Sequence, residues 1–194
     1  MVSVCAKIRI RFQLTVFSVL KLRRIKINPY FWAQFRNTMK KFAIEIKWGI
    51  RYTFCYLAWA IFEKVMGVFG ENISYYMLSS LLFYLFASVI YTVALKEKKT
   101  NYFHGNMDWK QGTATGLYMT IVIAILMPLT QACLHKVIAP EFFENMIALS
   151  KDKVAAKSYF NLKSYILQTV FFTLSIGIVI AAIVSYFIQT KKSK

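Results

Sequence analysis

The side chains of this sequence that could do chemistry are few, and three of them lie inside long apolar stretches. Glu63 lies in one such stretch, and Gln131 and His135 lie four positions apart in another, which places them on one face of a helix. An ionisable group inside a membrane is a functional candidate, because an unpaired charge is costly there. Glu63, Gln131 and His135 therefore form a candidate intramembrane polar site that could line the path of a proton or small solute.

A structural explanation of Glu63 competes with this one, and the sequence favours it. Glu63 lies shortly before the turn at Gly70-Glu71-Asn72, where its carboxylate can be solvated near the outer membrane surface or accept a hydrogen bond from a tyrosine or histidine. It also belongs to a stripe at helical spacing that we expect to face other helices. The stripe consists of Tyr52, Tyr56, Trp59, Glu63 and Gly67.

No set of residues typical of a catalytic or metal site occurs in the sequence. The three cysteines, Cys5, Cys55 and Cys133, have no CxxC spacing, and His104 and Asp108 have no third partner nearby. HExxH, GxSxG and P-loop motifs are absent from the sequence, as are paired intramembrane aspartates. The sequence therefore predicts no catalytic residue, no metal site, no cofactor and no enzymatic activity.

The composition is that of a membrane protein. Hydrophobic residues make up 58% of the 194 positions, mean hydropathy is +0.47, and soluble domains have an apolar share of roughly 45–50%. The formal net charge of +17 could indicate a nucleic-acid partner in a soluble protein. Beside membrane spans, however, Lys and Arg set orientation and contact anionic lipid headgroups. We expect the lipid bilayer, and not nucleic acid, as the partner.

Four apolar stretches are long enough to cross a bilayer. They run at about residues 48–69, 73–95, 113–137 and 164–189. The segment at about 140–158 has acidic residues early, lysines late and apolar residues at helical spacing, which is typical of an amphipathic helix lying in the membrane interface. The sequence therefore predicts an all-α integral membrane protein, an antiparallel bundle of four transmembrane helices with one interfacial helix between the third and fourth spans.

Two of these spans carry small residues that permit close helix packing. Gly112 and Gly116 open the third span, and Gly177, Ala181 and Ser185 recur every four residues in the fourth. These faces could pack within the bundle or against another copy or another membrane protein. Pro128 removes a backbone donor inside the third span and is expected to kink it.

The distribution of charge predicts the orientation. The N-terminal region through Arg51, the connection between the second and third spans, and the C-terminal tail hold 19 of the 25 Lys and Arg residues. By the positive-inside rule both termini are cytoplasmic. Residues 1–38 carry basic residues and no acidic residue, whereas Met39-Lys40-Lys41 is typical of a start, so this extension is either untranslated or a basic arm on the inner leaflet.

From Met39 to about Lys192 the chain resembles an uncharacterised family of small inner-membrane proteins of Gram-negative bacteria. The family is the domain of unknown function numbered four-one-nine-nine. The resemblance rests on the Met-Lys-Lys start, on KKTNYFHGNMDWKQGTATGL entering the third span, and on IAPEFFENM after it. It implies a bacterial cytoplasmic membrane location and a four-helix architecture of residues 39–192, and no activity, substrate or catalytic residue.

Two functions remain in competition. The first expectation is a multi-pass membrane protein of non-enzymatic function, a structural, accessory or assembly subunit whose small-residue faces pack against copies of itself or another membrane protein. The alternative is a transporter or channel for a small solute or proton, acting as an oligomer, with Glu63, Gln131 and His135 along the path.

Overall fold

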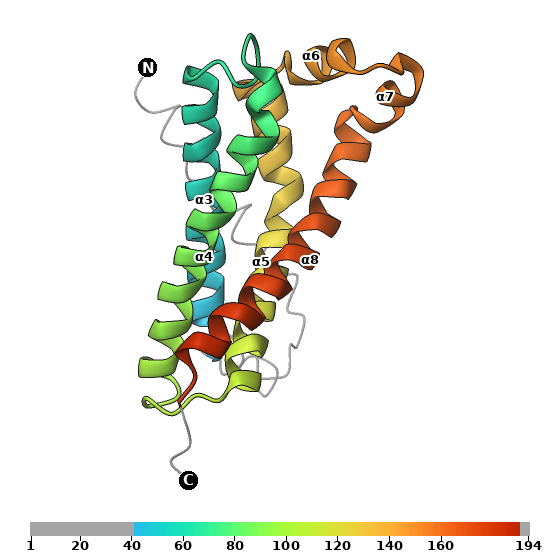
Figure 1. Ribbon diagram of the computed structural model, residues 1–194. Coiled ribbons are helices and arrows are strands. Elements are labelled where there is room, and N and C mark those ends of the chain that lie inside the picture. Colours follow the sequence, from blue (N-terminus) through green and yellow to red (C-terminus); the bar gives the residue numbers. More distant parts are fainter. Residues whose placement is uncertain (1–40, 191–194) are drawn as a thin grey trace, which may run out of the picture. The chain divides into compact units, whose positions relative to one another are not determined.

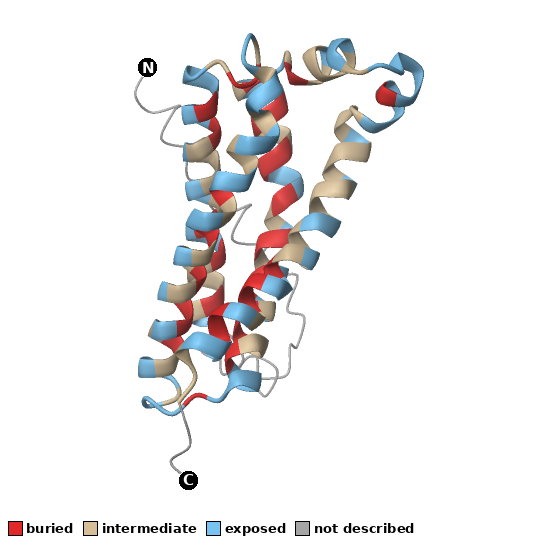
Figure 2. Cartoon of the chain, viewed as in Figure 1, coloured by how far each residue is buried: buried red, intermediate tan, exposed pale blue. Residues whose placement is uncertain are grey.

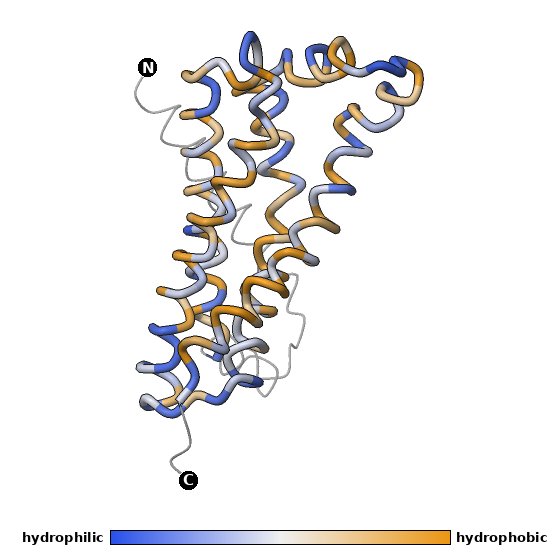
Figure 3. The backbone as a smooth tube through the Cα atoms, viewed as in Figure 1, coloured by the Kyte–Doolittle hydropathy of each residue, from blue (hydrophilic) through white to orange (hydrophobic). Residues whose placement is uncertain are grey.

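The computed structural model describes residues 41–190. The chain separates into two units, residues 1–41 and 42–194, and the predicted basic extension (1–38) lies outside the described residues. Every regular element in the described part is helical, as predicted (Figure 1). Among residues 41–190, three helical stretches are long and apolar enough to cross a membrane: Ile73–Asn101, Trp109–Ile138 and Leu162–Ile188. Figure 3 shows apolar residues recurring along each of them.

The first helix, α3 (Ala43–Val65), starts and ends earlier than the predicted 48–69. It ends at Val65 because Gly67 adopts a positive φ of 72°. The Val68 amide then bonds to the Glu63 carbonyl at 2.9 Å and the Gly67 amide to the Lys64 carbonyl at 3.0 Å, a Schellman ending.

The second helix is longer than its apolar run. A 3₁₀ turn, η1 (Ile73–Tyr75), leads into α4 (Tyr76–Asn101), which passes the predicted end at 95. The additional turn is held by Lys98, whose buried ammonium lies 2.8 Å from a carboxylate oxygen of the equally buried Glu45 on α3. A tertiary ion pair therefore extends the helix into the lysine-rich segment.

The third helix, α5 (Trp109–Cys133), begins before the predicted 113 because Asp108 and Gln111 form a capping box. The helix continues through Pro128 and passes at Leu134 into a π-helical turn, η2 (Leu134–Ile138). The prediction of one helix at about 140–158 is wrong, since two short helices, α6 (Phe142–Leu149) and α7 (Lys153–Tyr159), occupy this segment. Asp152 separates them by accepting the Val154 and Ala155 amides as the cap of α7.

The last helix, α8 (Leu162–Ile188), packs closely on α5 through small residues. A Cβ added to Gly112 would lie 2.7 Å from the Ser185 hydroxyl, and one added to Gly116 would overlap the Ala181 side chain. Gly177 in turn faces Thr120 of α5. All five predicted packing residues therefore meet across α5 and α8 within one chain, where Figure 2 shows much of the burial of α8.

Hydrogen bonds fasten the end of α8 next to this contact. Thr190 donates its amide to the Met107 carbonyl at 2.8 Å, and the Met107 amide donates to the Thr190 hydroxyl. The Trp109 indole donates to the Ala182 carbonyl, and the Lys99 ammonium to the Ile188 carbonyl at 2.7 Å. Figure 1 shows this end of α8 close to α5, whereas its start lies away from α5, beside α7.

Candidate functional site

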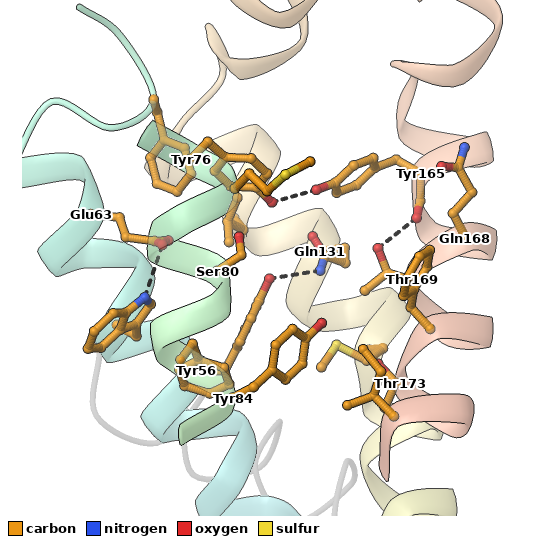
Figure 4. Close-up of a pocket in the computed structure, with 18 of the residues that line it drawn as sticks. Tyr56, Glu63, Tyr76, Ser80, Tyr84, Gln131, Tyr165, Gln168, Thr169 and Thr173 are labelled. Atoms are coloured by element: carbon orange, nitrogen blue, oxygen red, sulfur yellow. Dashed lines mark hydrogen bonds between the residues drawn. The ribbon is translucent and has the colours of Figure 1, made fainter. Parts of the chain in front are cut away.

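A cavity of about 530 Å³ lies between the diverging half of α8 and the helices α3, α4 and α5. Figure 4 shows residues of all four helices facing it. At the close-packed end the small residues leave no such space, whereas between Leu162 and Gly177 the side chains of α8 that face the cavity are larger, and several of them are polar. Those that line the cavity include Thr173, Thr169, Gln168 and Tyr165.

A hydrogen bond between two tyrosines joins α4 to the diverging half of α8. The hydroxyl oxygens of Tyr76 and Tyr165 lie 2.6 Å apart, although the residues are 89 positions apart in sequence (Figure 4). Tyr165 also makes edge contacts with the rings of Phe142 and Phe143 on α6. The cavity is thus bounded here by a contact that the sequence did not reveal.

Aromatic rings dominate the wall. Ten of the 26 lining residues are aromatic, and the rings of Tyr52, Tyr56 and Trp59 all pack against Phe83 at centroid distances of 5.6, 5.1 and 5.9 Å. The wall contains one charged residue among those described, Glu63. Apolar walls with a few placed polar groups are typical of small-molecule sites, whose volumes are about 300–1,000 Å³.

Glu63 is buried, with 5% of its surface exposed, and neutral groups hold it. The Trp59 indole donates to Oε1 at 2.9 Å, and the Ser79 hydroxyl donates to the same oxygen at 2.5 Å. Within the described residues Oε2 accepts no hydrogen bond, and no Lys or Arg lies within ion-pair distance of the carboxylate. The donors are a tryptophan and a serine, and not the tyrosine or histidine that the structural explanation expected.

The structure brings Gln131 to the same cavity and leaves His135 outside it. Gln131 donates to the Tyr56 hydroxyl at 3.2 Å, while its buried Oε1 has no partner in the described part of the chain. His135 lies in η2, where it stacks on Phe142 with ring centroids 4.8 Å apart and meets the Tyr165 ring edge-on. It is not a lining residue, so the three candidates do not form one continuous path.

The lysine next to Glu63 in sequence pairs with a different carboxylate. Lys64, next to Glu63 in sequence, forms an ion pair with Glu141 and is not a lining residue. Burial acts to raise the pKa of the Glu141 carboxyl, but the hydrogen bond and charge of Lys64 outweigh this, and its pKa lies below the usual value. Glu141 is therefore charged at neutral pH and holds Lys64 at α6.

Sequence reasoning missed the α8 side of the cavity. The signal was present, because Tyr165, Gln168, Thr169, Phe172 and Thr173 recur at intervals of three and four. Of the stripe on α3, Tyr52, Tyr56, Trp59 and Glu63 line the cavity and Gly67 does not. Within residues 41–190 no group of three His, Cys, Asp or Glu side chains could hold a metal ion.

Comparison with known proteins identifies the family. No curated protein and no solved structure matches the chain. A family model, DUF4199, whose description is a protein of unknown function, matches residues 47–190. The matched range contains all the lining residues of the cavity and all of the α5–α8 contact, and it confirms the resemblance seen in the sequence. The chain belongs to the DUF4199 family.

Proposed function

We propose that this protein is a non-enzymatic membrane protein that binds a small solute in the cavity between α3, α4, α5 and α8. The observation that carries the proposal is the cavity itself, about 530 Å³ with an aromatic wall and one carboxylate. Binding at membrane depth is the step that a carrier or transporter requires. This favours the solute-handling alternative over the accessory subunit.

The proposal includes a membrane arrangement. We place α3 as a fourth span in an antiparallel bundle with α4, α5 and α8, although α3 carries five charged residues. They are Glu45, Lys47, Arg51, Glu63 and Lys64. The first three lie in its first nine residues, next to the headgroups, where Glu45 pairs with Lys98 and Lys47 pairs with Glu97. We further propose a bacterial inner membrane, both termini cytoplasmic, and α6 and α7 in the outer interface against lipid headgroups.

An obstruction of the cavity tests the binding function. The full chain and its Thr173→Trp variant, which places an indole in the wall, are purified in mild detergent and weighed by native mass spectrometry. We expect the parent to retain a small molecule that the variant loses. Val179→Trp is the matched control, since Val179 lies on the same helix but is 56% exposed and does not line the cavity. Identical ligand-free spectra for all three proteins would contradict the proposal.

An accessory or assembly subunit is the second candidate. Its sequence support, the small-residue faces, lies inside the α5–α8 contact of one chain. A different observation favours it, because Val154 of α7 is 83% exposed, lies outside the three apolar helices of the described residues and does not line the cavity. The same spectra test it: a stoichiometric second protein that Val154→Glu releases would support a subunit function, and a lone chain or homo-oligomer would not.

A further inference from the structure

The charges and acceptors of the cavity point to one class of solute. We propose that the cavity binds a small protonated organic amine with an apolar body, with Glu63 as its counter-charge. This inference rests on the proposed solute-binding function and specifies its ligand. Three features of the described residues support it: the state of the Glu63 carboxylate, an unmatched amide oxygen, and the composition of the wall.

Within residues 41–190 no cation pairs with the carboxylate of Glu63. Each of the three ion pairs of the described residues uses another acidic residue: Glu45 with Lys98, Glu97 with Lys47, and Glu141 with Lys64. Trp59 and Ser79 supply Oε1 with two neutral donors and leave Oε2 without one. Since an unpaired charge is costly at membrane depth, a cationic occupant would be strongly favoured over a neutral one.

A second acceptor lies in the same wall. The Oε1 atom of Gln131 is buried and has no donor within residues 41–190, while its Nε2 is engaged with Tyr56. A protonated amine carries N–H donors for both Glu63 and Gln131, whereas an anion would leave both acceptors unmatched. Figure 4 shows the two side chains on different helices, α3 and α5, at one cavity.

The rest of the wall suits the apolar body and the positive charge together. Tyrosine, tryptophan and phenylalanine faces attract cations through their ring quadrupoles as well as burying hydrocarbon. No Lys, Arg or His occurs among the described lining residues, so the phosphate of a zwitterionic lipid headgroup would find no positive partner there. The chemistry therefore selects a free amine over a phospholipid.

Ligands that differ in one terminal group test this inference. Phenylbutylamine, phenylbutanol and phenylbutanoate share an arylalkyl body and end in a cation, a neutral donor and an anion. Their binding to the full chain is measured by equilibrium dialysis in uncharged dodecyl maltoside micelles, against protein-free micelles. We expect the amine to bind about tenfold or more tightly than the alcohol, and the anion weakest.

Two carboxylate variants locate the effect. Glu63→Gln keeps the shape of the wall and should reduce amine affinity about tenfold while leaving the alcohol unchanged. Glu141→Gln removes the same charge outside the cavity and should change neither, and its thermal unfolding serves with that of Glu63→Gln to verify folding. Equal affinity for amine and alcohol, or an amine preference that survives Glu63→Gln, overturns the inference but leaves solute binding intact. Binding of none of the three ligands, together with no retained molecule in the spectra, overturns both.

Discussion

The two halves of α8 differ in how closely they pack against the neighbouring helices. From Gly177 onward its small residues bring its backbone against α5, and hydrogen bonds from Trp109 and Lys99 fasten its end. Before Gly177 its tyrosine, glutamine and threonine side chains face a cavity. Residue size along one helix therefore decides where the protein is packed and where it can hold a ligand.

Two ion pairs, one at each end of the molecule, differ in their burial. Glu45 and Lys98 are almost wholly buried at the close-packed end, with the Lys98 ammonium 4.1 Å from the centroid of the Tyr102 ring. Lys64 and Glu141 at the cavity end are partly exposed, with 42% and 34% of their side chains accessible. Removing one partner should therefore leave a buried charge at the close-packed end and a partly solvated one at the cavity end.

The largest expected effect compares these two pairs. Lys98→Met should lower the free energy of unfolding by about 3–5 kcal/mol, because it leaves Glu45 buried without its cation. Lys64→Met should change it by about 0–1 kcal/mol, since solvent screens that pair. Reversible unfolding in mixed micelles measures both. Equal losses for the two variants would contradict the contrast between the ends.

The next largest effect compares two substitutions by leucine, one at the close contact of α5 and α8 and one in the cavity. Gly116→Leu should destabilise the protein by about 1–3 kcal/mol, because the new side chain meets Ala181 with no room to move. Thr173→Leu should be nearly neutral, as its side chain enters the cavity. The same unfolding measurement applies, and a Thr173→Leu loss as large as that of Gly116→Leu would show that the cavity is not accessible space.

The smallest expected effect compares the loss of two tyrosine hydroxyls, one on each side of Gly177. Tyr91→Phe breaks the buried bond to the Thr120 hydroxyl, 2.6 Å long, and should cost about 0.6 kcal/mol. Tyr165→Phe breaks the hydrogen bond to Tyr76 and should lower the free energy of unfolding by no more than this. In a protein that also carries Thr169→Cys, however, it should speed the labelling of residue 169 by a thiol reagent. If labelling of that cysteine is unchanged, the tyrosine pair does not close this side of the cavity.

Most of the long helices could be predicted from apolar runs in the sequence, but the residues at which they begin and end could not. Three long apolar stretches became helices that could cross a membrane, since hydropathy over about 20 residues is a strong signal. The ends depended on local and tertiary contacts: the Schellman ending at Gly67, the capping box at Asp108, and Lys98 reaching Glu45. Such contacts need partners that no single stretch contains.

Only one side of the candidate site was predicted from the sequence. The spacing of Tyr52, Tyr56, Trp59 and Glu63 indicated an inward face, and these four residues line the cavity. The opposite wall depends on the direction in which α8 leaves α5, and hydropathy carries no such information. His135 shared a helical face with Gln131 by spacing, but the π-helical turn at Leu134–Ile138 and the rings of Phe142 and Phe143 place it in another environment.

Because hydrogen bonds hold α8 at its C-terminal end, a small tilt of the helix there moves its N-terminal end over a larger distance. From Ala181 to Tyr165 the helix rises by about 24 Å, at about 1.5 Å per residue. A rotation of about 5° at the Gly116–Ala181 contact would move Tyr165 by about 2 Å along that arm. This is enough to break a 2.6 Å hydrogen bond to Tyr76. The shorter arm from Ala181 to Thr190, about 14 Å, would move by only about 1 Å. Under the proposed function, a tilt of this one helix would admit a solute without any helix unfolding.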